Sequence, residues 1–74
     1  MARIPIETLG KILAGEERGR YVKVMSDKEH TGGFLILTGE SRDLKNGYDN
    51  WVENEAGLEK YFRESNWLVE WLDS

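Results

Sequence analysis

The stretch GYDNWVENEAGLEKYFRESNWLVEWL, residues 47–72, carries all three tryptophans of this 74-residue chain. Large aromatic rings bury much apolar surface, so a short chain that gathers them in one stretch builds its core there. The pattern predicts a strand over Tyr48–Val52, a helix capped by Asn54 and a second strand. The helix presents one apolar face, formed by Leu58, Tyr61 and Phe62. The second strand presents an aromatic face, formed by Trp67, Val69 and Trp71.

The first half of the chain predicts three more elements. Apolar residues recur at helical spacing after Pro5, and Gly15 stands where a helix would end, so we expect a short helix over residues 5–14. Residues 20–25 alternate like a strand, with Val22 and Val24 on one face. The apolar run over residues 33–38 is flanked by glycines and predicts a buried strand that forms a hairpin with residues 20–25.

These elements predict an α+β fold in the order α-β-β-β-α-β. We expect one domain over residues 1–74, with two short helices on a three- to four-stranded, mostly antiparallel sheet. The chain has no cysteine, which excludes disulfides and thiolate zinc sites. It also lacks a long apolar run and the apolar core of a secretory signal, so we expect a cytoplasmic protein.

Charge is distributed unevenly along the chain. The net charge is -4; residues 1–37 hold six basic and five acidic groups, whereas residues 38–74 hold four basic and nine acidic groups. An acidic half repels phosphate backbones, so we do not expect nucleic acid as a partner. We also expect no membrane partner, since the chain has no long apolar run. The same field favours a basic protein partner, although in a small domain such acidity is more often a matter of solubility.

Two groups of polar residues are candidates for a metal-binding site. Asp27, Glu29 and His30 lie close in sequence, but a lone histidine without a second ligand or nucleophile at a known spacing rarely defines a site. Asp43, Asn46 and Asp49 faintly resemble a calcium loop, yet Lys45 stands where an oxygen ligand is needed. Asn46-Gly47 is explained by a tight turn. We therefore expect no metal and no cofactor.

No pattern of residues indicates catalysis. The glycine pairs form no phosphate-binding motif, and Glu55 and Glu59, one helical turn apart, form a solvated face rather than a catalytic pair. Trp51 and Tyr48 are aromatic residues beside carboxylates, which suits a protein interface, although an aromatic in a short strand is more often core. The candidate partner-binding residues are Asp43, Tyr48, Asp49, Trp51, Glu53 and Glu55.

The leading hypothesis is a small, non-enzymatic interaction module, for example a stoichiometric inhibitor of the immunity or antitoxin kind that covers a basic partner. The alternative is a structural homo-oligomer or accessory subunit, since the core is small and a strand edge would be open. A third possibility is a small-ligand binder or enzyme with a pocket lined by Tyr21, Tyr48 and acidic groups.

Overall fold

The structure is a computed structural model that describes residues 4–27, 32–44 and 47–72. In these residues the chain forms five strands and one helix. The elements are β1 (Leu9–Ala14), β2 (Tyr21–Asp27), β3 (Gly33–Gly39), β4 (Tyr48–Val52), α1 (Glu55–Ser65) and β5 (Leu68–Trp71). The molecule is therefore a small α+β domain, as expected, but with one more strand and one helix fewer than predicted among these residues.

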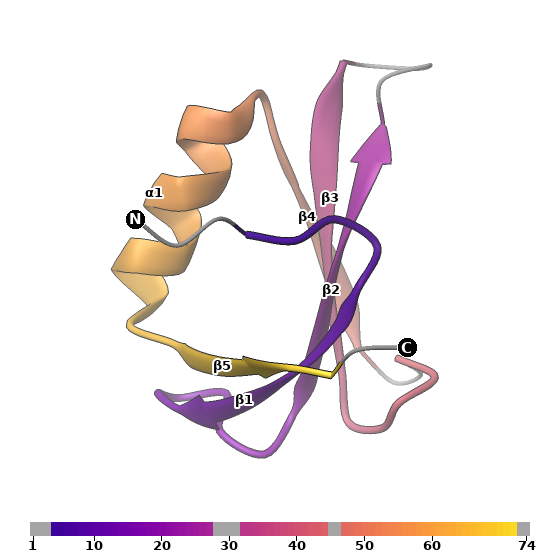
Figure 1. The fold of residues 1–74 in the computed structure, drawn as a ribbon, viewed down its shortest axis with the longest axis vertical. Helices are drawn as coiled ribbons and strands as arrows, with labels where there is room; N and C mark the ends of the chain where they lie inside the picture. The colour runs from indigo at the N-terminus through magenta and orange to yellow at the C-terminus, as the bar shows by residue number, and fades with distance from the viewer. Residues whose placement is uncertain (1–3, 28–31, 45–46, 73–74) are drawn as a thin grey trace.

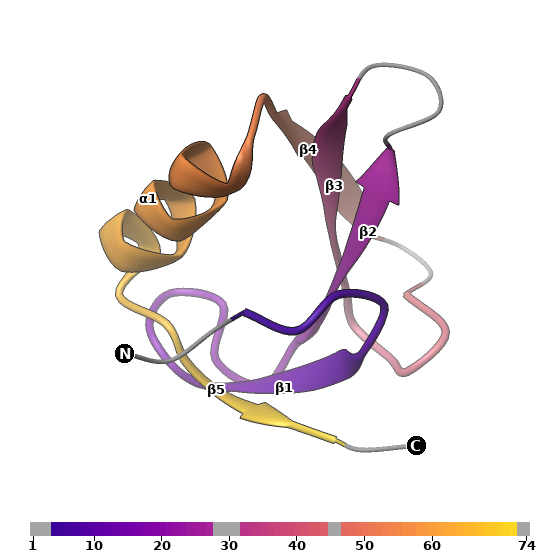
Figure 2. The same ribbon diagram turned by 45° about the horizontal axis from the view of Figure 1, so that its top comes forward.

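The five strands form one antiparallel sheet in the order β4-β3-β2-β1-β5. The first four strands follow one another as a meander, and β5 returns to pair with β1. Because β4 and β5 are the two edges, α1 carries the chain from one edge of the sheet to the other. Figures 1 and 2 show the sheet curling so that α1 lies across its open side.

The predicted helix over residues 5–14 is wrong, because residues 9–14 form strand β1. Burial there has a period of two: Gly10 and Ile12 are buried, whereas Leu13 points outward and is 41% exposed. The helical spacing of Ile6, Leu9 and Leu13 was a coincidence, since these side chains do not share a buried face. Strand pairing on both sides of β1 outweighs the weak local preference for a helix.

The other predicted strands are confirmed with small changes of boundary. The central hairpin pairs Val22 with Thr38 and Val24 with Ile36, which places these side chains on the inner face of the sheet. Ile12 joins them from β1, and these inner side chains are almost completely buried. The core is completed by Phe34 and by Leu58 of α1.

Helix α1 has the predicted boundaries because a capping residue stands at each end. The side chain of Asn54 accepts a hydrogen bond from the Gly57 amide at 2.8 Å, which satisfies one of the unpaired donors of the first turn. Asn66 ends the helix in the left-handed conformation, with a φ of 56°. Beyond it, Trp67 meets Phe62 edge to face, with ring centroids 5.3 Å apart, so the predicted aromatic packing of β5 against α1 is confirmed.

The N-terminal residues of the described chain also contribute to the core. Ile4 lies against the core cluster, and the segment that follows crosses the open side of the sheet in Figure 2 before entering β1. Within the described residues, α1 is too short and too polar to cross a membrane.

Candidate partner-binding surface

Strand β4 presents two different faces because side chains alternate along a strand. Val52 and Asn50 are paired with Phe34 and Ile36, so they face inward toward α1. Asn50 donates a hydrogen bond to the hydroxyl of Tyr61 at 3.0 Å, which ties this face of β4 to the helix. Asp49 and Trp51 therefore point to the outer face, away from the helix.

Trp51 lies on the outer face of the sheet and is 48% exposed. It stands opposite Leu35, which is itself opposite Met25 on β2. The three side chains form an apolar row across three strands, called here the Trp51 row. Leu35 and Met25 are half-buried, so much of the row remains accessible to a partner.

Gly33 brings the Trp51 ring close to the sheet. A Cβ atom at Gly33 would lie 2.7 Å from the indole Nε1 and 2.2 Å from the carbonyl oxygen of Val52. Only a residue without a side chain fits there. The ring therefore lies close to the backbone of β3, and about half of its surface, 48%, is exposed.

Charged groups flank the Trp51 row. Asp49 lies two residues from Trp51 on the same face, and Asp27 pairs with Gly33 at the end of β2. Lys23 lies across from Leu37 in the neighbouring row that contains Asp49. Asp49 thus lies on the same strand as Trp51, whereas Asp27 and Lys23 both lie two strands away from it, on β2.

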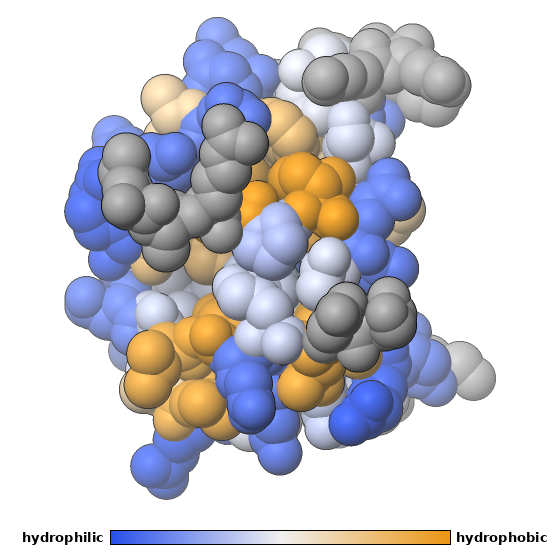
Figure 3. Space-filling model, in the orientation of Figure 1, coloured by the Kyte–Doolittle hydropathy of each residue, from blue (hydrophilic) through white to orange (hydrophobic). Residues whose placement is uncertain are grey.

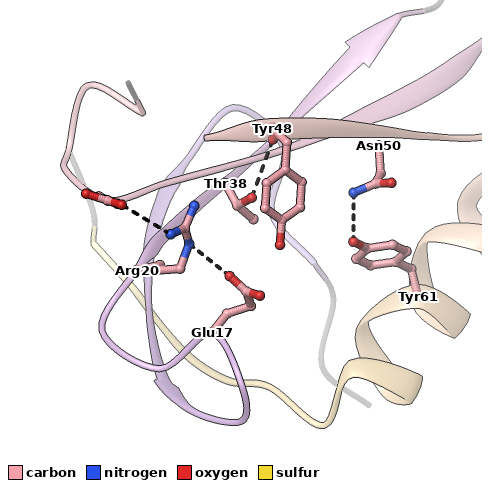
Figure 4. Close-up of polar contacts among 7 residues, drawn as sticks. Glu17, Arg20, Thr38, Tyr48, Asn50 and Tyr61 are labelled. Atoms are coloured by element: carbon pink, nitrogen blue, oxygen red, sulfur yellow. Dashed lines mark hydrogen bonds and ion pairs between the residues drawn. The ribbon is translucent and has the colours of Figure 1, made fainter. Parts of the chain in front are cut away.

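Tyr48 does not share this surface with Trp51, although the two residues are close in sequence. Tyr48 pairs with Thr38, whose hydroxyl donates to the Tyr48 carbonyl at 3.4 Å, and its side chain emerges on the side of the sheet that faces α1. There the Arg20 guanidinium lies 5.7 Å from the centre of its ring. Figure 4 shows the Tyr48 ring between Arg20 and Tyr61.

The remaining predicted residues are spread along the strand. Asp43 is exposed in the loop before β4, where its carboxylate accepts a hydrogen bond from Ser41 and lines a shallow hollow with Tyr21. Glu53 and Glu55 are exposed beyond the opposite end of β4, at the start of α1. The six candidates thus do not form a single cluster: Asp49 and Trp51 share the outer face, Tyr48 faces the other way, and the loop and helix residues lie at opposite ends.

Sequence reasoning missed a second group of residues on the helix side of β4. A hollow there is lined by Tyr48, Tyr61, Trp67 and the carboxylates Glu16, Glu17 and Glu64. Burial raises the pKa of Tyr61, and nearby Tyr48 and Glu17 raise that pKa further. Nothing in the sequence links the turn at residues 15–19 to α1, because only the topology of the sheet brings them together.

The metal readings find no support in the part of the chain that the structure describes, where no group of three or more potential ligand residues could hold a metal ion. Glu29 and His30 of the first candidate lie outside the described residues, as do Lys45 and Asn46 of the second. In the part of the chain that the structure describes, Tyr21 and Tyr48 line different hollows, Tyr21 beside Asp43 and Tyr48 beside Tyr61.

Comparisons with known proteins do not identify a function for this surface. A scan against protein-family models, a search of curated proteins and a search of solved structures each gave no match.

Proposed function

We propose that this protein is a non-enzymatic interaction module that binds a basic protein through the Trp51 row. In its most specific form it is a stoichiometric inhibitor that covers a basic surface of its partner in the cytoplasm. The observation that carries the proposal is the half-exposed Trp51 ring, held against the sheet by Gly33. Tryptophan is among the residues that most often dominate binding energy at protein interfaces.

The row supplies apolar contact area, and its surroundings supply charge. Leu35 and Met25 continue the apolar surface beyond the tryptophan, Asp49 places negative charge beside it, and Asp27 lies next to Met25 at the far end of the row. A buried aromatic anchor with a charged rim is the usual anatomy of a specific interface. The acidic second half of the chain, with nine acidic and four basic groups, would speed encounter with a basic partner and make it sensitive to salt.

The test begins with capture of binding proteins at low and high salt, followed by titration calorimetry with the basic protein that is recovered. Trp51→Ala is expected to weaken binding by about 2 kcal/mol, roughly thirtyfold, if the ring is an anchor. Asp49→Asn should slow association and reduce its salt dependence, because a rim charge acts mainly on the encounter rate.

Leu68→Ala is the matched control for this test. Leu68 is 61% exposed and lies on β5, the opposite edge of the sheet, so its truncation should leave the affinity unchanged. The proposal fails if Trp51→Ala binds as tightly as the wild-type protein, or if Leu68→Ala has the larger effect.

The alternative function is a structural homo-oligomer, and one observation favours it. Leu13 and Leu68 are 41% and 61% exposed on the neighbouring strands β1 and β5. Figure 3 shows hydrophobic surface at the end of the molecule where Figure 1 places these strands. Pairing of two copies along the β5 edge would cover that surface.

Analytical ultracentrifugation distinguishes the two functions without knowledge of a partner. The homo-oligomer predicts a dimer that Leu68→Lys converts to a monomer while Trp51→Ala does not. A monomer at millimolar concentration would exclude this alternative and leave the interaction module in place.

A further inference from the structure

The hollow on the helix side of β4 has the size and lining of a small binding site. Its volume is about 380 Å³, near the lower end of the range for ligand pockets. It lies where the turn between β1 and β2, the start of β4 and the last turn of α1 come together. Its functional groups are those of Glu16, Glu17, Tyr48, Tyr61, Glu64 and Trp67.

Aromatic rings form the walls of this hollow. The rings of Tyr61 and Trp67 meet edge to face, with centroids 5.8 Å apart and an angle of 70° between their planes. Trp67 is held close to Gly15, where a Cβ atom would lie 3.0 Å from the indole Cδ1. Tyr48, which is 46% exposed, supplies a third ring. The faces of such rings carry negative partial charge and attract cations.

The molecule already places one cation against this group. Arg20 lies 5.7 Å from the centre of the Tyr48 ring, and its Nε is 2.8 Å from the Glu17 carboxylate. In Figure 4, Arg20 and Glu17 lie to one side of the Tyr48 ring and Tyr61 lies to the other. Glu16 and Glu64 line the same hollow, and neither is paired with Arg20, whose other ion-pair partner is Glu40.

The electrostatic environment points the same way. The pKa of Tyr61 is raised, first by burial and then by Tyr48 and Glu17, which means that a further negative charge is unfavourable here. Burial disfavours a charge of either sign, so only the contribution of the Glu17 carboxylate favours a cation here. The polarised ring faces and the carboxylates act in the same direction, so a cationic group would be attracted by both.

We infer that this hollow binds an alkylammonium group, supplied either by a lysine side chain or by a small free amine. The aromatic walls would contact the methylene or methyl groups of the cation, and Glu16 and Glu64 would face its charge. This site is separate from the Trp51 row, and the inference goes beyond the proposed function without depending on it.

The test is an NMR titration that compares a cation with a neutral molecule of the same shape. Choline is the cationic probe, and 3,3-dimethyl-1-butanol is its uncharged equivalent. Choline is expected to shift the Gly15 amide and Trp67 indole signals saturably, with a Kd at or below about 10 mM. The neutral probe should bind roughly fivefold more weakly or worse, because it lacks the cation–π attraction.

A second titration separates the two sources of the ligand. Nα-acetyl-Nε-trimethyllysine methylamide carries the same head group on a lysine side chain. If it binds more tightly than choline, contacts beyond the head group favour a protein source; equal affinity favours a free amine. The inference is overturned if no probe gives saturable shifts, or if the neutral probe binds as well as choline.

Variants locate the binding within the hollow. Tyr48→Leu and Glu64→Gln are expected to lower the choline affinity roughly three- to tenfold. Glu59→Gln is the matched control, because Glu59 is exposed on the same helix but does not line the hollow. Equal affinities in Tyr48→Leu, Glu64→Gln and Glu59→Gln would overturn the assignment. Trp51→Ala should leave choline binding intact, so failure of one proposal does not imply failure of the other.

Discussion

Trp51 and Trp71 occupy the two edge strands of the same sheet, and each lies against a glycine of the neighbouring strand. Trp71 on β5 stands opposite Gly10 of β1, where a Cβ atom would come within 2.7 Å of its ring. Trp51 on β4 lies over Gly33 of β3 in the same manner. The two rings differ in the face they occupy: Trp71 packs on the core, whereas Trp51 remains 48% exposed on the outer face.

The same local arrangement, a large ring over a glycine, serves two purposes in this fold. A glycine allows a large ring to lie close to the backbone of an adjacent strand, whichever side of the sheet the ring occupies. On the inner face the ring closes the core against α1, so its contribution is to stability. On the outer face the same close approach leaves the ring rigid and accessible, which adds little to the core and suits recognition.

The strongest test of this division is truncation of each ring. Trp71→Ala should destabilise the fold by about 3 kcal/mol, because it leaves a cavity beside Phe62 and exposes the core. Trp51→Ala should cost less than about 1 kcal/mol, since half of the ring is already in water. Urea unfolding of both variants measures the difference. Equal losses of stability in the two variants would contradict the assignment of Trp71 to the core and of Trp51 to recognition.

A second test addresses the glycine rather than the ring. Gly33→Ala should destabilise by about 2 kcal/mol and move Trp51 away from the sheet, because the new Cβ would collide with the Val52 carbonyl oxygen. Urea unfolding gives the free energy, and the chemical shift of the Trp51 indole reports the displacement.

The control for this substitution is Gly57→Ala in α1, where the nearest atoms to a new Cβ lie 3.5 Å away. There the same change should stabilise by about 0.5 kcal/mol, since alanine favours the helix. If Gly33→Ala is also neutral or stabilising, the close approach of Trp51 to β3 is not needed for the fold.

The smallest expected effect concerns the inner side of β4, where Tyr61 binds Asn50. The pKa of Tyr61 is raised above the 10.0 of a free tyrosine, so the folded state holds this proton more tightly than the unfolded state does. The resulting stability is fully present below pH 10.0 and is lost as the pH rises through the raised pKa. Urea unfolding between neutral pH and pH 11 should show a steeper loss in the wild-type protein than in Tyr61→Phe. Parallel curves would contradict the buried environment of this hydroxyl.

The sequence was sufficient to predict the second half of the fold because local and long-range signals agree there. Asn54 caps α1, Leu58 faces the core, and Val69 and Trp71 alternate with outward residues, as expected. Residues 5–14 were mispredicted because their apolar spacing fits a helix, while the reason for the strand lies across the sheet in Trp71. The local sequence around Gly10 does not indicate that Trp71, far away in the chain, lies opposite it.

The candidate surface was predictable only in part for a similar reason. The exposure of Trp51 depends on β4 being an edge strand, and strand order cannot be read from local patterns. Tyr48 and Trp51 are three residues apart, which places them on opposite faces of a strand; treating them as one cluster ignored that period of two. Glu17 lies in the turn between β1 and β2, whereas Tyr61 and Glu64 lie on α1, so only the complete fold brings these residues together.

The pairing of β1 with β5 also has a consequence for the order of events during folding. These strands lie near opposite ends of the chain, so their contact requires closure of a loop that spans most of its length. The β2–β3 hairpin and α1 can form from nearby residues, but the contacts that Val69 and Trp71 add to the core require β5. Such non-local contacts slow folding. A nascent chain therefore cannot complete the pairing of Ile12 with Val69 until β5 has been synthesised.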